Sequence, residues 1–497
     1  MFSDLRLRVD DARLFLLPMR TRMPFRYGIA RVVELNHCIL QLEVRRSIAP
    51  GYYMPYAKAQ NIFARGLAAD HLAPKWFTKN PETSYEADVT EMLRVIRQAM
   101  QFALAAEPGT PFEMWQQVYR AQSEWGKAEG LVPLLTQFGA SLVERALIDG
   151  FCQMRDAPFA TLLRENAFGI HLGSVHSELE GFQPADFLPA KPLERVRIRH
   201  TVGLSDPLWE ADIAFEERAG DNLPQSLEAC IRLDGVRHFK IKVGGDPEAD
   251  TTRLVRVFAV IAAYAPMDWA FSLDGNESYK SFEDLQLLWM EMQTHPGLSP
   301  YLSRLLFFEQ PLHRDVALSP VTKNGFEQWA DGPTVVIDES DAGLDSLPRA
   351  LSLGYAGTSH KNCKGVFKSI ANACLLEHRC RQNPNQSLLL TGEDLSNVGP
   401  IALHQDLAVQ AALGIESVER NGHHYFAGLT PFPSEVQTSV AALHPDLYDT
   451  HAGFPALNIE NGYISLKTIN ETPFGHFRYQ EHADPQAWAE DVTEVKS

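Results

Sequence analysis

Three carboxylates stand at the ends of short apolar runs in the middle of the sequence. Asp274 lies in Ser-Leu-Asp-Gly-Asn, Glu309 in Phe-Phe-Glu-Gln-Pro and Asp338 in Val-Ile-Asp-Glu-Ser. A single acid at such a place is usually a helix cap or a turn former. Three acids at the same depth on adjacent strands would repel each other unless a cation lay between them. Because oxygen ligands without His or Cys suit Mg²⁺, or Mn²⁺, better than zinc, the pattern predicts a metal site.

Lysines flank these acids in the sequence. In Lys240-Ile-Lys242, strand alternation puts both lysines on one face and Ile241 on the other. An exposed edge strand whose lysines reach solvent is the alternative. Lys361 follows a later apolar run, in Thr-Ser-His-Lys-Asn. If the strands form a ring of eight, the second and sixth strands lie opposite each other, so that Lys242 and Lys361 would face opposite sides of one substrate carbon.

Opposed lysines around a metal suit the removal of the α-proton of a carboxylate. The metal and Lys240 would hold the carboxylate and stabilise the enediolate, while Lys242 and Lys361 act as base and acid. We expect neighbouring positive charges to lower the pKa values of the lysines. Racemisation or epimerisation, dehydration and cycloisomerisation all remain open. The alternatives are a Schiff-base lysine aldolase, which gives the three carboxylates no role, and a non-catalytic metal-binding barrel.

The elements that must position these residues form a repeat. Each of eight apolar runs is followed by a helix-patterned stretch, which predicts a modified (β/α)8 barrel of the TIM type with its catalytic groups at the C-terminal strand ends. An open doubly wound sheet is the alternative, but no Gly-rich phosphate loop is present. The runs are Val196–Val202, His238–Val243, Trp269–Asp274, Leu305–Glu309, Thr334–Asp338, Gly357–Lys361, Ser387–Gly392 and Ser417–Arg420.

The remainder of the chain predicts a second, α+β domain. We expect a capping domain over residues 1–194, the barrel over 195–449, and a C-terminal segment, 450–497, that packs back on the capping domain. The capping domain should have strands around Ala12–Pro18 and Leu35–Val44 and helices from Tyr85, over Phe112–Lys127 and over Leu131–Arg155. The basic, aromatic segment Arg20–Ile29, interrupted by Pro24 and Gly28, should be a loop.

Composition limits the partners. The 497 residues carry 45 Lys and Arg against 63 Asp and Glu, a net charge of −18, which disfavours nucleic acid and anionic membranes. No stretch approaches the roughly 18–20 apolar residues of a membrane span, and the start lacks signal-peptide features. Six scattered cysteines without a C-x-x-C pair suit a reducing compartment. We therefore expect a cytoplasmic enzyme that acts on a small molecule, as a homo-oligomer.

Two further pairs of residues leave alternatives open. Glu393 and Asp394 follow the seventh run, where they could bind a polar substrate group or cap a helix near Ser396. His423 and His424 follow the eighth run and could line the pocket, but adjacent histidines more often form a turn with surface imidazoles. We leave both pairs outside the predicted catalytic set.

The order K-x-K, D-x-N, E-Q-P, D-E-S and a lysine on the sixth strand resembles the enolase superfamily, and within it the muconate-lactonizing-enzyme-like subgroup of the mandelate racemase/muconate lactonizing enzyme family. The resemblance covers nearly the whole chain. It implies a lyase or isomerase with Mg²⁺ on Asp274, Glu309 and Asp338. Lys242 and Lys361 would be the acid–base pair, and Lys240 would lie near the substrate carboxylate.

The resemblance also implies that Arg20–Ile29 closes over the substrate. Some features depart from the family pattern. The seventh run has no His, and Gly392-Glu-Asp stands where dipeptide epimerases carry D-x-D. Lys364-Gly-Val replaces the usual K-x-G-G. These departures leave the substrate undetermined.

Overall fold

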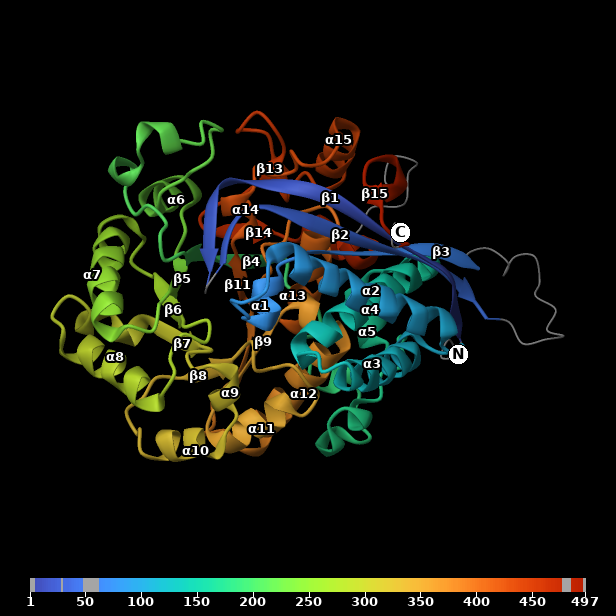
Figure 1. Cartoon of the computed structure of the whole chain (residues 1–497), viewed down its shortest axis with the longest axis horizontal. Coiled ribbons are helices and arrows are strands. Elements are labelled where there is room, and N and C mark those ends of the chain that lie inside the picture. Colours follow the sequence, from blue (N-terminus) through green and yellow to red (C-terminus); the bar gives the residue numbers. More distant parts are fainter. Residues whose placement is uncertain (1–4, 28–29, 48–61, 476–483, 495–497) are drawn as a thin grey trace.

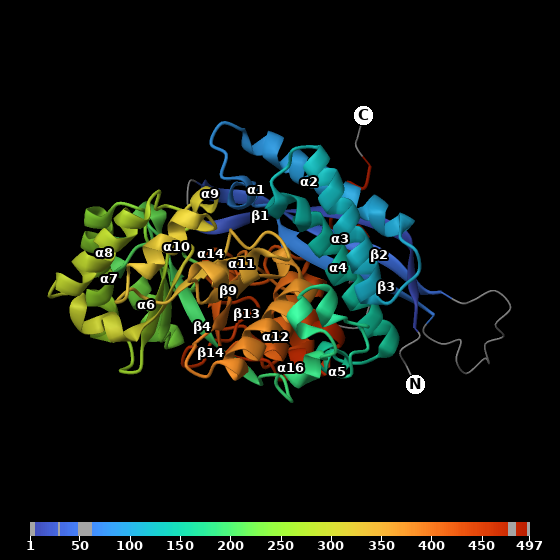
Figure 2. The same ribbon diagram turned by 90° about the horizontal axis from the view of Figure 1, so that it is seen from below.

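The computed structural model describes residues 5–27, 30–47, 62–475 and 484–494, and it has two parts (Figure 1). One part is a closed barrel of parallel strands surrounded by helices. The other is an antiparallel sheet with helices packed on it, whose long strand β1 extends over the barrel (Figure 2). The expected TIM-type barrel with an α+β cap is confirmed, and the open-sheet alternative is wrong.

Eight strands form the barrel in chain order, and each pairs in parallel with the next. The last strand pairs with the first, from Ser417 opposite Arg197 to Arg420 opposite His200, which closes the ring. Every strand coincides with or lies within one of the apolar runs, except that β4 begins one residue earlier, at Arg195. The strands are β4 (Arg195–Val202), β5 (His238–Lys242), β6 (Ala270–Asp274), β7 (Leu305–Glu309), β8 (Val335–Ile337), β9 (Gly357–His360), β10 (Leu389–Gly392) and β11 (Ser417–Arg420).

Helices between the strands form the outer layer of the barrel. The first of them shows how the sequence sets their ends: the Ser226 hydroxyl accepts a hydrogen bond from the N–H of Ala229, and Gly235 ends the helix at φ 64°. The helices are α6 (Leu227–Asp234), α7 (Pro247–Tyr264), α8 (Phe282–Thr294), α9 (Arg314–Ala317), α10 (Pro320–Glu327), α11 (Ser346–Leu353), α12 (Val366–Gln382) and α13 (Ala402–Leu413).

The two faces of strand β5 differ in chemistry. Ile241 packs outward in an apolar cluster that includes Leu254 and Val257 of α7. Lys240 and Lys242 are 1% and 6% exposed and donate hydrogen bonds to carboxylates inside the barrel. β5 pairs with β4 on one side and β6 on the other. The exposed edge-strand alternative is therefore wrong for these lysines.

The cap packs its helices on the sheet formed by β1, β2 and β3. Helix α4 contacts both this sheet and the barrel, and the Glu144 carboxylate on it accepts hydrogen bonds from the N–H groups of Val366 (2.9 Å) and Phe367 (2.6 Å) at the start of α12. The cap elements are β1 (Leu7–Tyr27), β2 (Ala30–Arg46), β3 (Phe63–His71), α1 (Pro74–Thr78), α2 (Tyr85–Ala105), α3 (Pro111–Ala128), α4 (Pro133–Arg155) and α5 (Phe159–Arg164). The expected strands and helices of this region are all present.

The segment expected as a loop, Arg20–Ile29, is instead mostly strand. Its residues up to Tyr27 belong to β1, and Gly28 and Ile29 lie outside the described residues. Phe25 pairs with Val32 of β2, and the register shifts between Arg20 and Phe25, the stretch that contains Pro24. Pairing with β2 thus outweighs the tendency of Pro24 to interrupt the strand, and the result is a shift in register rather than a loop. The described residues among 19–35 are called the hairpin end below.

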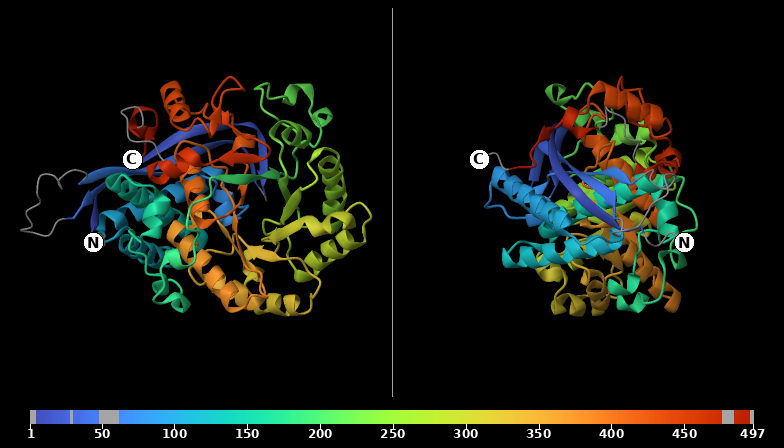
Figure 3. Two further views of the ribbon diagram at one scale, coloured as in Figure 1. Left: turned by 180° about the vertical axis from the view of Figure 1, so that it is seen from behind. Right: turned by 90° about the vertical axis from the view of Figure 1, so that its right-hand side faces the viewer.

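The C-terminal region returns to both parts of the molecule. β14 pairs antiparallel with barrel strand β4, and β15 pairs antiparallel with β1 of the cap. Figure 3 shows these late segments beside the early strands. The division into two domains at residues 194 and 450 stays a prediction. The elements are α14 (Gly422–Tyr425), α15 (Ser434–Leu443), β12 (Tyr448–Asp449), β13 (Ala456–Leu457), β14 (Tyr463–Ser465), α16 (Lys467–Glu471) and β15 (Glu490–Asp491).

Two features of the chain bear on its surroundings. Among the described residues, none of the helices has the length and apolar character needed to cross a membrane. All six cysteines are free thiols, and five of them are buried.

Candidate active site

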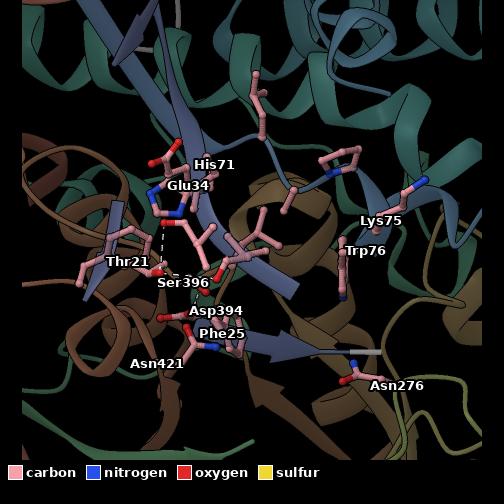
Figure 4. Close-up of a pocket in the computed structure, with 18 of the residues that line it drawn as sticks. Thr21, Phe25, Glu34, His71, Lys75, Trp76, Asn276, Asp394, Ser396 and Asn421 are labelled. Atoms are coloured by element: carbon pink, nitrogen blue, oxygen red, sulfur yellow. Dashed lines mark hydrogen bonds between the residues drawn. The ribbon is translucent and has the colours of Figure 1, made fainter. Parts of the chain in front are cut away.

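A cavity of about 320 Å³ lies between the hairpin end and the C-terminal ends of the barrel strands. Thr21 and Phe25 of the hairpin end and Trp76 of α1 form part of its wall on the cap side (Figure 4). Lys242 and Lys361 line it on the barrel side. The place agrees with the rule that active sites of such barrels lie at the C-terminal face of the strands.

Lys242 and Lys361 reach this cavity from opposite sides of the barrel. Lys242 is the last residue of the second barrel strand, β5, and Lys361 follows the sixth, β9. Each ammonium group is held by one buried carboxylate: Lys242 Nζ lies 2.6 Å from Asp274 Oδ2, and Lys361 Nζ lies 2.6 Å from Asp338 Oδ2. Lys361 Nζ also lies 4.4 Å from the ring centroid of Trp76, a cation–π contact. Two cationic groups thus face one cavity.

Asp274, Glu309 and Asp338 lie beneath the cavity and are fully buried. The first two stand opposite each other on β6 and β7, and Lys242 stands opposite Asp274 on β5, so these residues form one layer of the barrel. Asp338 directly follows β8. The three carboxylates do end adjacent strands, as the sequence indicates, and lysine ammonium groups lie between them.

Lys240 is the centre of this charge cluster. Its Nζ lies within 2.6–3.0 Å of four carboxylates, those of Asp274, Glu309, Glu393 and Glu419. These carboxylates hold the pKa of Lys240 well above its ordinary value, although burial alone would lower it. Lys240 lies below the cavity and does not line it. A direct contact with a substrate carboxylate, as the resemblance implies, stays a prediction.

The chemistry of the carboxylate set fits a divalent cation. Burial, and then the charges of Asp274 and Glu393, raise the pKa of Glu309 well above its ordinary value, whereas neighbouring lysines hold the pKa values of Asp274 and Asp338 below theirs although burial alone would raise them. Glu309 Oε2 accepts no hydrogen bond of good geometry, although Lys240 Nζ lies 2.9 Å from it. Three buried oxygen ligands suit Mg²⁺. The carboxylate oxygens of Asp274, Glu309 and Asp338 are not all within 4.8 Å of one another. Within the described chain, the only triad of ligand-type side chains that meets this distance lies at another place.

The expectation that neighbouring cations lower the lysine pKa values is wrong for Lys361. Burial and the charge of Lys240 lower the pKa of Lys361, but the charge of Asp338, with smaller contributions from Glu309 and Glu419, outweighs both effects, so that the pKa is raised. The sequence pattern places several lysines close together, but the ammonium group of each lies within 3.0 Å of a carboxylate oxygen. In this arrangement the carboxylates determine the direction of the pKa shift.

The structure assigns Glu393 and Asp394 to different places. Glu393 is fully buried in the barrel, where it pairs with Arg199 and Lys240. Asp394 lines the cavity, and its Oδ2 lies 3.2 Å from Arg420 Nη1. No helix begins at this point, since α13 begins at residue 402. The helix-cap alternative is therefore wrong, and only Asp394 is placed to meet a substrate.

The expected surface position of the two histidines is also wrong. His424 is 3% exposed, and His423 is half-buried with both ring nitrogens inaccessible to solvent. Neither residue lines the cavity described above. They lie instead beside His200 of β4, with ring centroids 4.7 Å from it for His424 and 5.7 Å for His423. The short helix α14 turns both side chains toward the outside of the barrel wall.

Several residues of the site are not identified by the sequence reasoning. Glu419 on β11 receives hydrogen bonds from Lys240 and Thr201, and it lines the cavity. Lys364 Nζ lies 2.9 Å from Asp338 Oδ1. Alternation along the eighth run, Ser-Val-Glu-Arg, could have indicated Glu419 as an inward residue. The spacing of Lys361 and Lys364, one turn apart, could have indicated the second lysine on Asp338.

Solved structures with the same architecture include mandelate racemase/muconate lactonizing enzyme-like members of the enolase superfamily. An enolase from Bradyrhizobium, complexed with magnesium and mandelic acid, has 11% sequence identity and a TM-score of 0.56, with 98% of this chain and 99% of that chain covered. A 2-chloromuconate cycloisomerase from Rhodococcus opacus 1CP has 14% sequence identity and a TM-score of 0.56, with 97% of this chain and 100% of that chain covered.

A dipeptide epimerase from Enterococcus faecalis V583, complexed with Mg and the dipeptide L-Leu-L-Tyr, has 14% identity, a TM-score of 0.52, and coverage of 84% of this chain and 92% of that chain. In sequence, the chain matches no family model and no curated protein. At this level of identity the likeness shows that the fold is shared.

Proposed function

We propose that the protein is a Mg²⁺-dependent lyase or isomerase of the enolase superfamily that removes the α-proton of a carboxylate substrate. The observation that carries the proposal is the meeting of Lys242 and Lys361, from opposite sides of the barrel, in one cavity above three buried carboxylates. Two solved structures of this fold hold magnesium together with mandelic acid or a dipeptide, both of which are carboxylates. The shared fold supports a similar ligand here.

Asp274, Glu309 and Asp338 would hold the metal ion. When bound, Mg²⁺ supplies a counter-charge for the negative charge that develops on the substrate carboxylate. Lys242 and Lys361 then exchange the proton on the two faces of the α-carbon. Each lysine now donates a hydrogen bond to one of the acids assigned to the metal, so the metal and the lysine compete for that carboxylate. Loss of these pairs is therefore part of forming a competent base.

The walls of the cavity restrict the substrate only in part. Phe25, Leu35 and Trp76 give an apolar side, and Asp394 and Asn421 give a polar one. A volume of about 320 Å³ is at the small end of the usual range of small-molecule sites. Racemisation or epimerisation, dehydration and cycloisomerisation are all compatible with this lining, so the proposal extends to the proton transfer and no further.

The test is α-proton exchange in D₂O with Mg²⁺ and a broad set of carboxylic acids. We expect mass spectrometry to show deuterium exchange with at least one acid. This exchange should be lost when a chelator removes Mg²⁺. Exchange with none of the acids would count heavily against the proposal. Mn²⁺ in place of Mg²⁺ should restore activity, because it takes similar oxygen ligands.

Two single substitutions separate the roles of the lysines. If each lysine serves one face, Lys242→Ala should abolish exchange of one enantiomer and Lys361→Ala that of the other, while Mg²⁺ affinity stays. Asp338→Ala should lower the exchange rates of both enantiomers by orders of magnitude, because the developing charge loses its counter-ion. Lys323→Ala, at an exposed lysine outside the cavity, is the matched control. Full turnover in both active-site lysine variants would refute the two-base assignment.

The same preparation distinguishes the alternatives. A Schiff-base aldolase needs a neutral lysine, but the pKa of Lys361 is raised and Lys242 is bound to Asp274. Borohydride trapping of a covalent adduct with a carbonyl compound would favour that alternative. Thermal stabilisation by carboxylates without exchange would favour a non-catalytic barrel. A cytoplasmic location and a homo-oligomeric state stay predictions, which fractionation and light scattering can check.

A further inference from the structure

A second cluster of ligand-type side chains lies on the outside of the barrel wall. His200 stands on β4, Cys230 in α6 and His424 in α14. The neighbours of His200 on the strand, Arg199 and Thr201, donate hydrogen bonds inside the barrel. Strand alternation therefore turns His200 outward, into the layer between β4 and α6. The cluster is separated by the barrel wall from the carboxylates assigned to Mg²⁺.

The geometry of the cluster is that of converging ligands. His200, Cys230 and His424 are 2%, 0% and 3% exposed, and their ligand atoms all lie within 4.8 Å of one another. Cys230 Sγ lies 3.8 Å from His424 Nδ1. The part of the chain that the structure describes contains no other His, Cys, Asp or Glu triad that meets this distance.

Buried ring nitrogens in this cluster lack partners. Nδ1 of His200 accepts and donates no hydrogen bond, and the same holds for both ring nitrogens of the adjacent His423. Buried polar atoms without partners cost folding free energy, so their presence in one place calls for an explanation. A bound cation would supply it, because a neutral imidazole nitrogen is a common metal ligand.

We propose that His200, Cys230 and His424 bind a transition-metal ion of the zinc type, independently of the carboxylate site. Two nitrogens and one sulfur form a donor set that zinc prefers and Mg²⁺ does not. Zinc bonds of about 2.0–2.1 Å to nitrogen and about 2.3 Å to sulfur place the two atoms roughly 3.6 Å apart in a tetrahedron. The 3.8 Å between Cys230 Sγ and His424 Nδ1 is close to that separation.

A water molecule or His423 would supply the fourth ligand. A cavity of about 50 Å³ is lined by His423 and His424, although not by His200 or Cys230, and it exceeds the roughly 10–15 Å³ that one water needs. On binding, the Cys230 thiol loses its proton to solvent and the thiolate takes the metal. Burial lowers the pKa of His200 to about 4, so that this imidazole is neutral and ready to bind. One proton should leave for each ion bound.

The site would have a structural consequence. It joins the first helix of the barrel to the turn that follows the last strand, where the ring closes. Asn421 and Phe426 flank this turn and line the cavity of the candidate active site. An ion on His424 would therefore hold in place the segment that presents these two side chains. Its role is that of a clamp, and it takes no part in proton transfer.

The experiment uses the full-length protein, freed of metals by a chelator and then saturated with Mg²⁺, to which Co²⁺ or Zn²⁺ is added. We expect one equivalent of Co²⁺ to give the visible bands of a tetrahedral site and a thiolate-to-cobalt charge-transfer band in the near ultraviolet. Zn²⁺ should displace it and raise Tm. Absence of the charge-transfer band in the wild-type protein would overturn the proposal, and this readout needs no variant.

Variants locate the ion. Cys230→Ser should lose the charge-transfer band and the Zn²⁺-dependent rise in Tm, and His200→Gln should weaken Co²⁺ binding at least tenfold. Cys374→Ser is the matched control, because Cys374 is also a buried free thiol in a barrel helix, and it should behave as wild type. An unchanged band in Cys230→Ser would overturn the assignment. Because Mg²⁺ is present throughout, the result does not depend on the proposed enzymatic activity.

Discussion

Replacing Lys240 by Met removes the ammonium group at the centre of the buried charge cluster while keeping the side chain's length. Lys240 Nζ lies 2.6–3.0 Å from four carboxylates, and the residue is 1% exposed. Solvent therefore cannot replace the lost charge. If Lys240 serves mainly as a counter-ion, Lys240→Met should lower the free energy of unfolding; if it serves only to bind substrate, stability should hardly change.

The size of the expected loss in unfolding free energy depends on which partners each carboxylate keeps when Lys240 is removed. Among the described residues, Glu309 has no hydrogen-bond donor to its side chain other than Lys240. Removing one partner of a buried ion pair costs about 3–5 kcal/mol, or about two to three and a half powers of ten in the folding equilibrium. The other carboxylates keep second partners, which are Lys242 for Asp274, Arg199 for Glu393 and Thr201 for Glu419.

Urea unfolding at pH 8 and at pH 5, with a chelator present, measures the loss. The pKa of Glu309 is already above its ordinary value, and removal of Lys240 raises it further. The folded variant then binds more protons than the unfolded chain, so its stability falls as pH rises and the deficit is larger at pH 8. Lys323→Met, at an exposed pair with Glu327, should change stability by less than about 0.5 kcal/mol. Wild-type stability of Lys240→Met at pH 8 would refute the reasoning.

Three other substitutions test the surroundings of the site. Burial raises the pKa of Asp149 to about 8, so Asp149→Asn should raise the free energy of unfolding by up to about 4 kcal/mol at pH 7. Below pH 4 the substitution should have no such effect, because the carboxyl group is then protonated in both states. Equal effects in denaturant unfolding at the two pH values would contradict this prediction. A Cβ on Gly66 would lie 1.9 Å from the carbonyl oxygen of Ala146, so Gly66→Ala should cost about 1–3 kcal/mol and lower Tm. Arg22 lies 2.6 Å from Asp221 and holds the hairpin end on the barrel; Arg22→Ala should cost about 2 kcal/mol and speed proteolysis of the hairpin end, and an unchanged cleavage rate would contradict this.

The barrel could be predicted from the sequence, but parts of the cap could not. Each barrel strand is a short apolar run with a polar end, which is a local signal. Strand β3, Phe-Ala-Arg-Gly-Leu-Ala-Ala-Asp-His, has no β-branched residue, and it is a strand because it pairs with β2 and packs under α4. Pro24 and Gly28 predict a loop, whereas pairing of Phe25 with Val32 makes a hairpin. In both cases long-range or cross-strand pairing outweighs local preference.

For the site, the positions of the lysines could be predicted and their partners could not. Alternation along β5 is enough to turn Lys240 and Lys242 into the barrel. Which carboxylate each ammonium group binds depends on the closed ring, which brings Glu393 and Glu419 next to Lys240. The direction of the pKa shift of Lys361 depends on the same neighbours. The burial of His424 likewise requires α6 and β4 to close around it, which no local pattern indicates.

The pairing of β15 with β1 has a consequence for protein synthesis. The N–H of Leu14 donates a hydrogen bond to the Thr493 hydroxyl, 479 residues later in the chain. On the ribosome, β1 emerges long before β15, so this edge of its sheet stays open until β15 has been made. The same strand carries the hairpin end that forms one wall of the cavity. Assembly of the candidate active site should therefore not be complete before residues 490–493 have emerged, and a nascent chain should need protection of this strand edge from aggregation until then.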